Sequence, residues 1–119
     1  MGLFQSWFGS RSGPEIPGVN AAELNGLLDS KEEILLVDVR SPSEYTHDGH
    51  IEGVRLLPLQ NLLQQAGELP QDQEIIFVCR SGNRSMVACQ QMARSGYSNV
   101  KNFDGGMIAW KMAGLPVSY

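Results

Sequence analysis

The stretch IIFVCRSGNRS, residues 75–85, decides the fold of this chain. Its apolar start, residues 75–78, is typical of a parallel strand that is buried on both faces. Cys79 ends this strand, and a short polar loop leads into a helix that we predict from about Asn83 to Arg94, with Gly96 after its end. A strand that passes through a tight loop into a helix is the repeating unit of an α/β fold.

The same alternation continues on both sides of this segment. Further strands are predicted within 34–39, 54–57 and 99–103, and further helices after Asn20, after Ser41, within 59–65 and after Gly105-Gly106. Asn20 with Glu23, and Ser41 with Glu44, have the spacing of reciprocal helix caps. We therefore predict an α/β fold, with a small, mostly parallel sheet that is flanked by helices on both faces.

The 119 residues suffice for one domain with its own core. Residues 14–119 carry the regular pattern and are predicted to form that domain, whereas residues 1–13 are expected to be a flexible N-terminal arm. Two interpretations of the arm stay open. It frays or packs on its own domain, or it is a short interfacial anchor, because its apolar side chains share one helical face and Gly2 with Ser6 fits a loose myristoylation pattern.

Charge and cysteine content exclude several classes of protein. The net charge of −4 argues against nucleic acid as a partner, and no apolar run is long enough to cross a membrane. Cys79 and Cys89 are the only cysteines, too few for a disulfide-stapled secreted domain, so we expect free thiols and a cytoplasmic location. The chain lacks the ligand clusters that zinc needs, and neither a metal nor an organic cofactor is expected.

Cys79 is predicted to be a reactive thiolate. It lies at the carboxyl edge of the sheet, beneath the N-terminus of a helix, where unpaired N–H groups and the helix dipole favour negative charge. Arg80 and Arg84 add positive charge in the same loop. The alternative is that Cys79 is a small, buried core residue, as a lone cysteine at a strand end usually is.

The loop after Cys79 is predicted to hold an anionic group attached to the sulfur. Gly82 lets the loop turn so that its backbone N–H groups point inward, and the serines add hydroxyl donors. The predicted binding loop consists of Arg80, Ser81, Gly82, Asn83, Arg84 and Ser85.

The segment CRSGNRS, residues 79–85, resembles the active-site loop of the rhodanese family of sulfurtransferases. Three other segments resemble the remaining signatures of that family in the same order: 36–45, 49–53 and 105–117. Together they cover about residues 16–118. The resemblance implies a rhodanese-like domain that transfers sulfane sulfur through a Cys79 persulfide. It also implies a small anionic donor such as thiosulfate, and a thiol or cyanide as acceptor.

Loop length separates this reaction from a related one. Four residues lie between Cys79 and Arg84, whereas related phosphatases and arsenate reductases have five. The shorter loop suits one extra sulfur atom better than a tetrahedral oxyanion. In this interpretation Arg84 and Arg80 attract the anionic donor by charge and paired hydrogen bonds.

Four residues outside the loop are candidates for supporting roles. Asp38 and Arg40 end a central strand and are predicted either to fix the loop through hydrogen bonds or to leave Arg40 in a surface pair with Glu44. Cys89 is interpreted as a core residue, with a disulfide-forming role as the alternative. His50 is interpreted as structural, with a role as general base as the alternative.

Two functions other than an enzyme for small donors stay open. The domain could be a relay module that receives persulfide sulfur from one protein and passes it to a sulfur-accepting protein, with little turnover of small molecules. It could also be an inactive structural copy of the fold, which the presence of Cys79 argues against.

Overall fold

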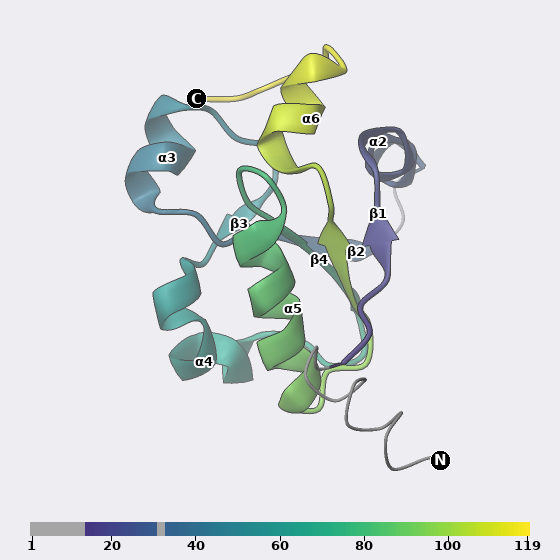
Figure 1. Ribbon diagram of the computed structural model, residues 1–119, viewed down its shortest axis with the longest axis vertical. Coiled ribbons are helices and arrows are strands. Elements are labelled where there is room, and N and C mark those ends of the chain that lie inside the picture. Colours follow the sequence, from purple (N-terminus) through teal and green to yellow (C-terminus); the bar gives the residue numbers. More distant parts are fainter. Residues whose placement is uncertain (1–13, 31–32) are drawn as a thin grey trace, which may run out of the picture.

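The structure is a computed structural model that describes residues 14–30 and 33–119. The predictions about the arm, residues 1–13, lie outside the described residues. Five strands form the sheet: β1 (Gly18–Val19), β2 (Ile34–Asp38), β3 (Arg55–Leu56), β4 (Glu74–Val78) and β5 (Val100–Phe103). The α-helices of the described residues are α2 (Ala21–Asp29), α3 (Pro42–His47), α4 (Leu62–Gln65), α5 (Asn83–Arg94) and α6 (Gly106–Met112), with the 3₁₀ turns η1 (Leu59–Asn61) and η2 (Ala66–Glu68) on either side of α4 (Figure 1).

The strands run in the order β1-β5-β4-β2-β3, and all adjacent pairs are parallel. Strand β4 lies in the centre, where Phe77 is in register with Val37 of β2 and with Asn102 of β5. The edge strands β1 and β3 have two residues each, which leaves little unpaired backbone at the edges. The predicted α/β fold is confirmed, and Cys79 follows its central strand.

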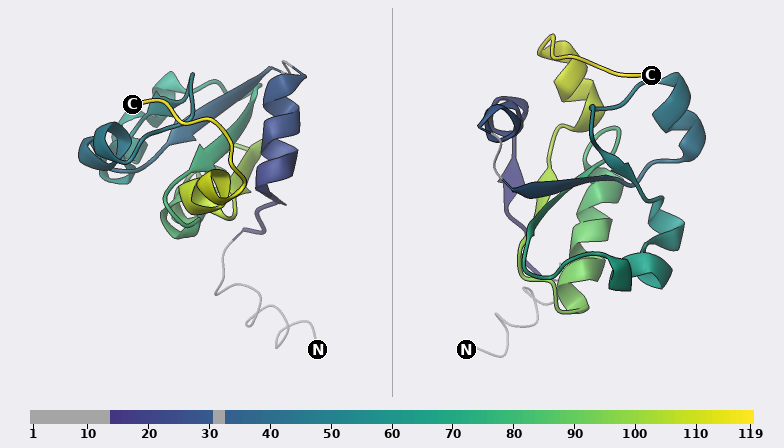
Figure 2. Two further views of the ribbon diagram at one scale, coloured as in Figure 1. Left: turned by 90° about the horizontal axis from the view of Figure 1, so that it is seen from above. Right: turned by 180° about the vertical axis from the view of Figure 1, so that it is seen from behind.

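Side chains of β4 alternate between two apolar layers, one on each face of the sheet. Ile75 and Phe77 pack with residues of α4 and α5, among them Leu62, Ala88 and Met92. On the other face, Ile76 and Val78 pack with residues of α2 and α6, which are Leu24, Met107 and Trp110. Figure 2 shows the helices disposed around the sheet in this way. Both layers are buried, so a continuous apolar run was the right signal for β4.

Side-chain hydrogen bonds at the N-termini of α2 and α3 explain where these two helices start. Asn20 and Glu23 form a reciprocal capping box at α2, and Ser41 and Glu44 form another at α3. The segment 59–65 differs from the continuous short helix predicted for it, because it divides into η1 and α4. No side chain caps either piece, and a helix this short without a cap does not sustain regular α-helical bonding. No helix in the described part of the chain is long and apolar enough to cross a membrane.

Candidate active site

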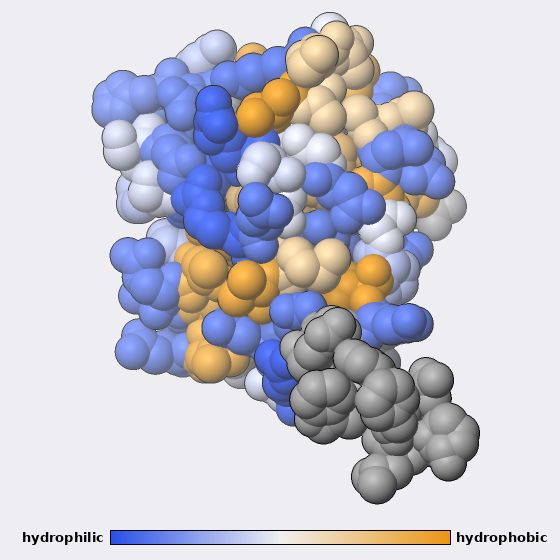
Figure 3. Space-filling model, viewed as in Figure 1, coloured by the Kyte–Doolittle hydropathy of each residue, from blue (hydrophilic) through white to orange (hydrophobic). Residues whose placement is uncertain are grey.

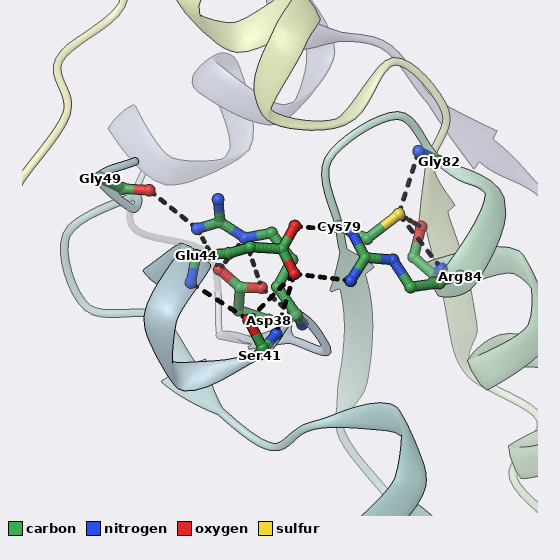
Figure 4. A network of polar contacts seen from close by, with 9 residues as sticks. Asp38, Ser41, Glu44, Gly49, Cys79, Gly82 and Arg84 are labelled. Carbon is green, nitrogen blue, oxygen red and sulfur yellow. Dashed lines mark hydrogen bonds and ion pairs between the residues drawn. The ribbon is translucent and has the colours of Figure 1, made fainter. Parts of the chain in front are cut away.

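Cys79 lies directly after β4, and the N-terminus of α5 faces its sulfur. The thiol is buried, with 1% of the residue exposed. The backbone N–H groups of Gly82 and Ser85 donate to Sγ at 3.1 and 3.3 Å, and the Ser85 hydroxyl lies 3.3 Å from it (Figure 4). The structure therefore contains loop donors around the sulfur, from the Gly82 and Ser85 backbone and the Ser85 hydroxyl, whereas the Ser81 hydroxyl that was also predicted as a donor is exposed to solvent.

Two opposed effects decide the acidity of this thiol. Burial raises the pKa of Cys79, while hydrogen bonds from the Ser85 hydroxyl and from the backbone of Ser85, Gly82 and Ser81 lower it. The hydrogen bonds prevail, so the pKa of Cys79 lies below the ordinary thiol value. Backbone and hydroxyl donors of the loop lower this pKa. The sequence also predicts a contribution from the charges of Arg80 and Arg84.

Gly82 is required at its position for two separate reasons. Its φ of 101° is in the left-handed region, which side chains with a Cβ rarely adopt. A Cβ at Gly82 would also meet the carbonyl oxygen of Asp104 at 2.0 Å. The turn at Gly82 therefore directs N–H groups at the sulfur and lets the loop lie against the segment that joins β5 to α6.

The elements on either side of that segment, β5 and the start of α6, hold the loop from outside. The N–H groups of Met107 and Ile108 donate to the carbonyl oxygens of Cys79 and Arg80 at 2.9 and 3.0 Å. Gly106 lies so close to the loop that a Cβ there would meet the Arg80 carbonyl oxygen at 2.4 Å. Asn102, buried in β5, donates to the Gly82 carbonyl at 3.2 Å. The signal for Asn102 in the sequence is a polar residue inside a buried strand, which periodicity does not assign to the loop.

Arg84 is engaged in an ion pair with α3. Its two terminal nitrogens donate to Glu44 Oε1 and Oε2 at 2.7 and 2.8 Å, and Ser41 also donates to Glu44 (Figure 4). The hydrogen bonds from Arg84, and to a smaller extent those from Ser41, lower the pKa of Glu44 to about 2. The same pair raises the pKa of Arg84. Arg84 therefore joins the start of α5 to α3, with its charge balanced by a carboxylate.

The other polar loop residues face solvent. Arg80, Ser81 and Asn83 are exposed, and across residues 14–30 and 33–119 their side chains have no hydrogen-bond or ion-pair partner. Arg80 is thus an unpaired cation next to Cys79 in the chain.

Asp38 and Arg40 form a buried ion pair with each other. Arg40 donates to both Asp38 carboxylate oxygens at 2.8–3.1 Å and to the Gly49 carbonyl oxygen at 2.8 Å. The predicted surface pair between Arg40 and Glu44 is wrong, because Arg40 is 1% exposed and Glu44 binds Arg84 instead. These contacts fix the turn at Gly49 and contain no bond to the loop at 80–85.

The remaining candidates have structural surroundings. His50 stacks on Tyr45 with ring centroids 3.7 Å apart, and its Nδ1 lies 3.0 Å from the Tyr45 carbonyl oxygen. Cys89 is fully buried in the core on the α5 side, and burial raises the pKa of its thiol to about 12. Both cysteines are free. Among the residues that the structure describes, no cluster of side chains suits a metal ion.

A groove of about 370 Å³ lies beside the loop. Its lining comes from the end of β2, the end of α3, the loop and α6: Arg40, Asp48, Arg80, Met107, Ile108, Lys111 and Met112. Cys79 is not among these residues, but its neighbour Arg80 is, and the backbone of the groove wall at Met107 is hydrogen-bonded to Cys79. The groove therefore adjoins Cys79 without enclosing its sulfur.

Fold and site together define an α/β domain that presents an activated cysteine at the carboxyl end of its central strand. Comparison with known proteins agrees: the model of the rhodanese-like domain matches residues 20–113. The chain belongs to the rhodanese family. This confirms the resemblance seen in the sequence. The chain is a rhodanese-like sulfurtransferase.

Individual relatives are similar over most of their length. A sulfurtransferase of Allochromatium vinosum is 37% identical over 99 residues, which cover 83% of this chain and 92% of that protein. The thiosulfate sulfurtransferase GlpE of Pseudoalteromonas translucida is 36% identical over 95 residues, covering 80% and 89%. The crystal structure of a rhodanese-related protein from Thermoplasma volcanium has a TM-score of 0.77 at 29% identity, covering 85% of this chain and 96% of that one.

Proposed function

We propose that the protein transfers sulfane sulfur from an anionic donor such as thiosulfate to a nucleophilic acceptor, through a persulfide on Cys79. One observation carries the proposal: the Cys79 sulfur, buried at the end of β4, accepts hydrogen bonds from the Gly82 and Ser85 N–H groups. Donors in this arrangement stabilise a thiolate and then the negative charge of a persulfide. The name of the GlpE relative supports thiosulfate as the donor.

In the first step the Cys79 thiolate attacks the outer sulfur of thiosulfate. A bond forms between the two sulfurs, and the bond from the outer sulfur to the sulfonate sulfur breaks. Sulfite leaves with the electron pair of that bond, and Cys79 carries the transferred sulfur. Arg80, exposed and unpaired beside Cys79, attracts the dianionic donor.

In the second step an acceptor thiolate or cyanide attacks the terminal sulfur of the persulfide. The sulfur–sulfur bond breaks, and the Cys79 thiolate leaves with the electron pair into the same set of N–H donors. The loop thus stabilises the sulfur anion at the start and at the end of the cycle. We assign the loop 80–85 to binding of donor and persulfide.

Arg84 has a positioning role in this proposal. Its guanidinium is bound by Glu44, so it holds the first turn of α5 in place and contributes less net charge to the donor than Arg80 does. Asp38 and Arg40 are assigned a supporting role beside the loop, where Arg40 lines the groove and their ion pair holds the turn at Gly49.

Production of thiocyanate from thiosulfate and cyanide tests the proposal. We expect steady turnover by the wild type, none above background by Cys79→Ala, and near wild-type turnover by the matched variant Cys89→Ala, because Cys89 is core and its thiol is held protonated. Equal activity of the two variants would contradict the assignment of Cys79. Sulfur loading without turnover would favour the relay function.

A further inference from the structure

The groove beside the loop is more cationic than the rest of the chain. The protein carries a net charge of −4, yet the groove is lined by Arg40, Arg80 and Lys111 against the single carboxylate of Asp48. Asp38 balances Arg40 at 2.8 Å, which leaves Arg80 and Lys111 in excess over Asp48. The Lys111 ammonium group donates to the Asp48 backbone carbonyl, a contact that leaves its charge uncompensated. The groove therefore favours an anionic occupant.

The wall that α6 contributes to the groove is apolar and continues onto the surface. Ile108 and Met112 line the groove and are 38% and 83% exposed. In Figure 3 apolar surface gathers over the α6 region at the top of the view, next to strongly hydrophilic surface. An exposed apolar wall next to free cations is not needed for an inorganic anion such as thiosulfate, which has no apolar part to bury.

The groove is also coupled to the reactive residue through the backbone. Met107 N–H donates to the Cys79 carbonyl, and Ile108 N–H donates to the Arg80 carbonyl, so the same helix end forms the groove wall and supports the loop. Arg80 belongs to both, because it lines the groove and follows Cys79 in the chain. An occupant of the groove therefore lies beside Arg80 and against the helix end that supports the loop of Cys79.

We propose that this groove docks an acidic, apolar segment of a partner protein whose thiol accepts the sulfur. Acidic side chains of the segment approach Arg80 and Lys111, and apolar side chains cover Ile108 and Met112. The proposal rests on the proposed function and specifies the chemistry of its acceptor. The transfer step is the one described above: the partner thiolate bonds to the terminal sulfur, and Cys79 leaves as thiolate.

Single-turnover transfer from sulfur-loaded protein to defined thiols tests the proposal. The probes are a blocked acidic peptide, Glu-Leu-Cys-Leu-Glu, its basic counterpart, Lys-Leu-Cys-Leu-Lys, and the small dicarboxylate thiol mercaptosuccinate. Each variant is compared with the wild type using the same probe, so differences in thiol acidity between probes cancel. The charge variant is Lys111→Glu, with Lys111→Gln as the milder change. Its matched control is Arg94→Glu, an exposed charge in the last turn of α5.

We expect Lys111→Glu to slow transfer to the acidic peptide by roughly threefold or more at low salt and to speed transfer to the basic peptide. Arg94→Glu should change neither rate to that extent. Met112→Ser should slow transfer to both peptides and leave mercaptosuccinate unaffected, whereas Leu63→Ser, an exposed apolar residue on α4, should affect none of the probes.

Two results would overturn the proposal. One is an equal effect of Lys111→Glu and Arg94→Glu on the acidic peptide. The other is an equal loss with Met112→Ser for peptide and mercaptosuccinate, which would indicate a small-molecule acceptor. Failure of the proposed function can be distinguished from failure of the docking proposal. If the proposed function is wrong, the wild type takes up no sulfur before any acceptor is added.

Discussion

Cys79 and Cys89 show how the surroundings of a thiol set its pKa. The two thiols are ten positions apart and both buried, yet the pKa of Cys89 rises to about 12 whereas that of Cys79 falls below the ordinary value. Burial acts on both in the same direction. The difference comes from the donors at the start of α5, which reach Cys79 at 3.1–3.3 Å.

Ser85 supplies two of these donors, and Ser85→Ala removes the hydroxyl while it keeps the backbone N–H. We expect the pH profile of Cys79 alkylation to move to higher pH, and sulfur loading at neutral pH to fall roughly tenfold, because a hydrogen bond to a charged group is lost. The control is Ser95→Ala, which removes a hydroxyl at the far end of α5. An unchanged alkylation profile for Ser85→Ala would show that the backbone donors alone set the acidity.

Gly82 is required for two reasons, its positive φ and the close approach of the Asp104 carbonyl. A comparison with Gly53 separates the effects of these two on stability. Gly82 and Gly53 both have positive φ, 101° and 86°, but only at Gly82 would a Cβ meet other atoms, the Asp104 carbonyl at 2.0 Å. We expect Gly53→Ala to lower the free energy of unfolding by about 1 kcal/mol. Gly82→Ala should cost more and should also abolish sulfur loading. Equal losses of stability in urea titrations of the two variants would contradict this account.

At the scale of elements, the sequence predicted those features that depend on residues close together in the chain. A continuous apolar run gave β4, and the Ser41 and Asn20 caps gave the starts of α3 and α2. Contacts between distant segments were not predictable in this way. Arg84 lies 40 positions from Glu44, whereas Arg40 is only four away, so sequence proximity suggested the wrong partner. The support of the loop by Asn102 and by α6 depends on β5 lying beside β4, which periodicity alone does not show.

The ion pair between α3 and α5 makes stability depend on pH. The pKa of Glu44 is lowered in the folded protein from 4.5 to about 2, so the pair stabilises the fold fully above about pH 4.5 and loses this contribution as the pH falls toward 2. Since both side chains are partly exposed, we expect Glu44→Gln to lower the free energy of unfolding by only about 1 kcal/mol at pH 7.

Urea titrations of wild type and Glu44→Gln from pH 7 to pH 2 measure this difference, which should vanish at the acid end. The control is Glu68→Gln, which removes the exposed pair with Arg55 and should have less effect. Glu44→Gln should also slow sulfur loading, because Arg84 loses the carboxylate that positions it. A stability difference that persists at pH 2 would contradict the linkage to Glu44.

At the scale of the whole molecule, the described contacts of the site come from β2, α3, the loop, α5, β5 and α6. The sheet brings these segments to one edge, the carboxyl ends of its parallel strands, which is where α/β folds place their sites. We propose that residues 14–119 form the sulfur-transfer domain.

Removal of residues 1–13 tests that proposal. We expect thiocyanate production and the midpoint of thermal unfolding to stay at wild-type values, because the contacts described for the site join residues within 14–30 and 33–119. The truncated and full-length proteins should differ only in partitioning to vesicles, if the arm is an anchor. Loss of activity on truncation would show that the arm is part of the functional unit.

The central claim is that Cys79 carries the transferred sulfur, and intact-mass analysis after incubation with thiosulfate tests it most directly. Wild type and Cys89→Ala should gain the mass of one sulfur atom, cyanide should remove it, and Cys79→Ser should gain none. A sulfur adduct that persists in Cys79→Ser, or a wild type that takes up no sulfur from thiosulfate, would contradict the account.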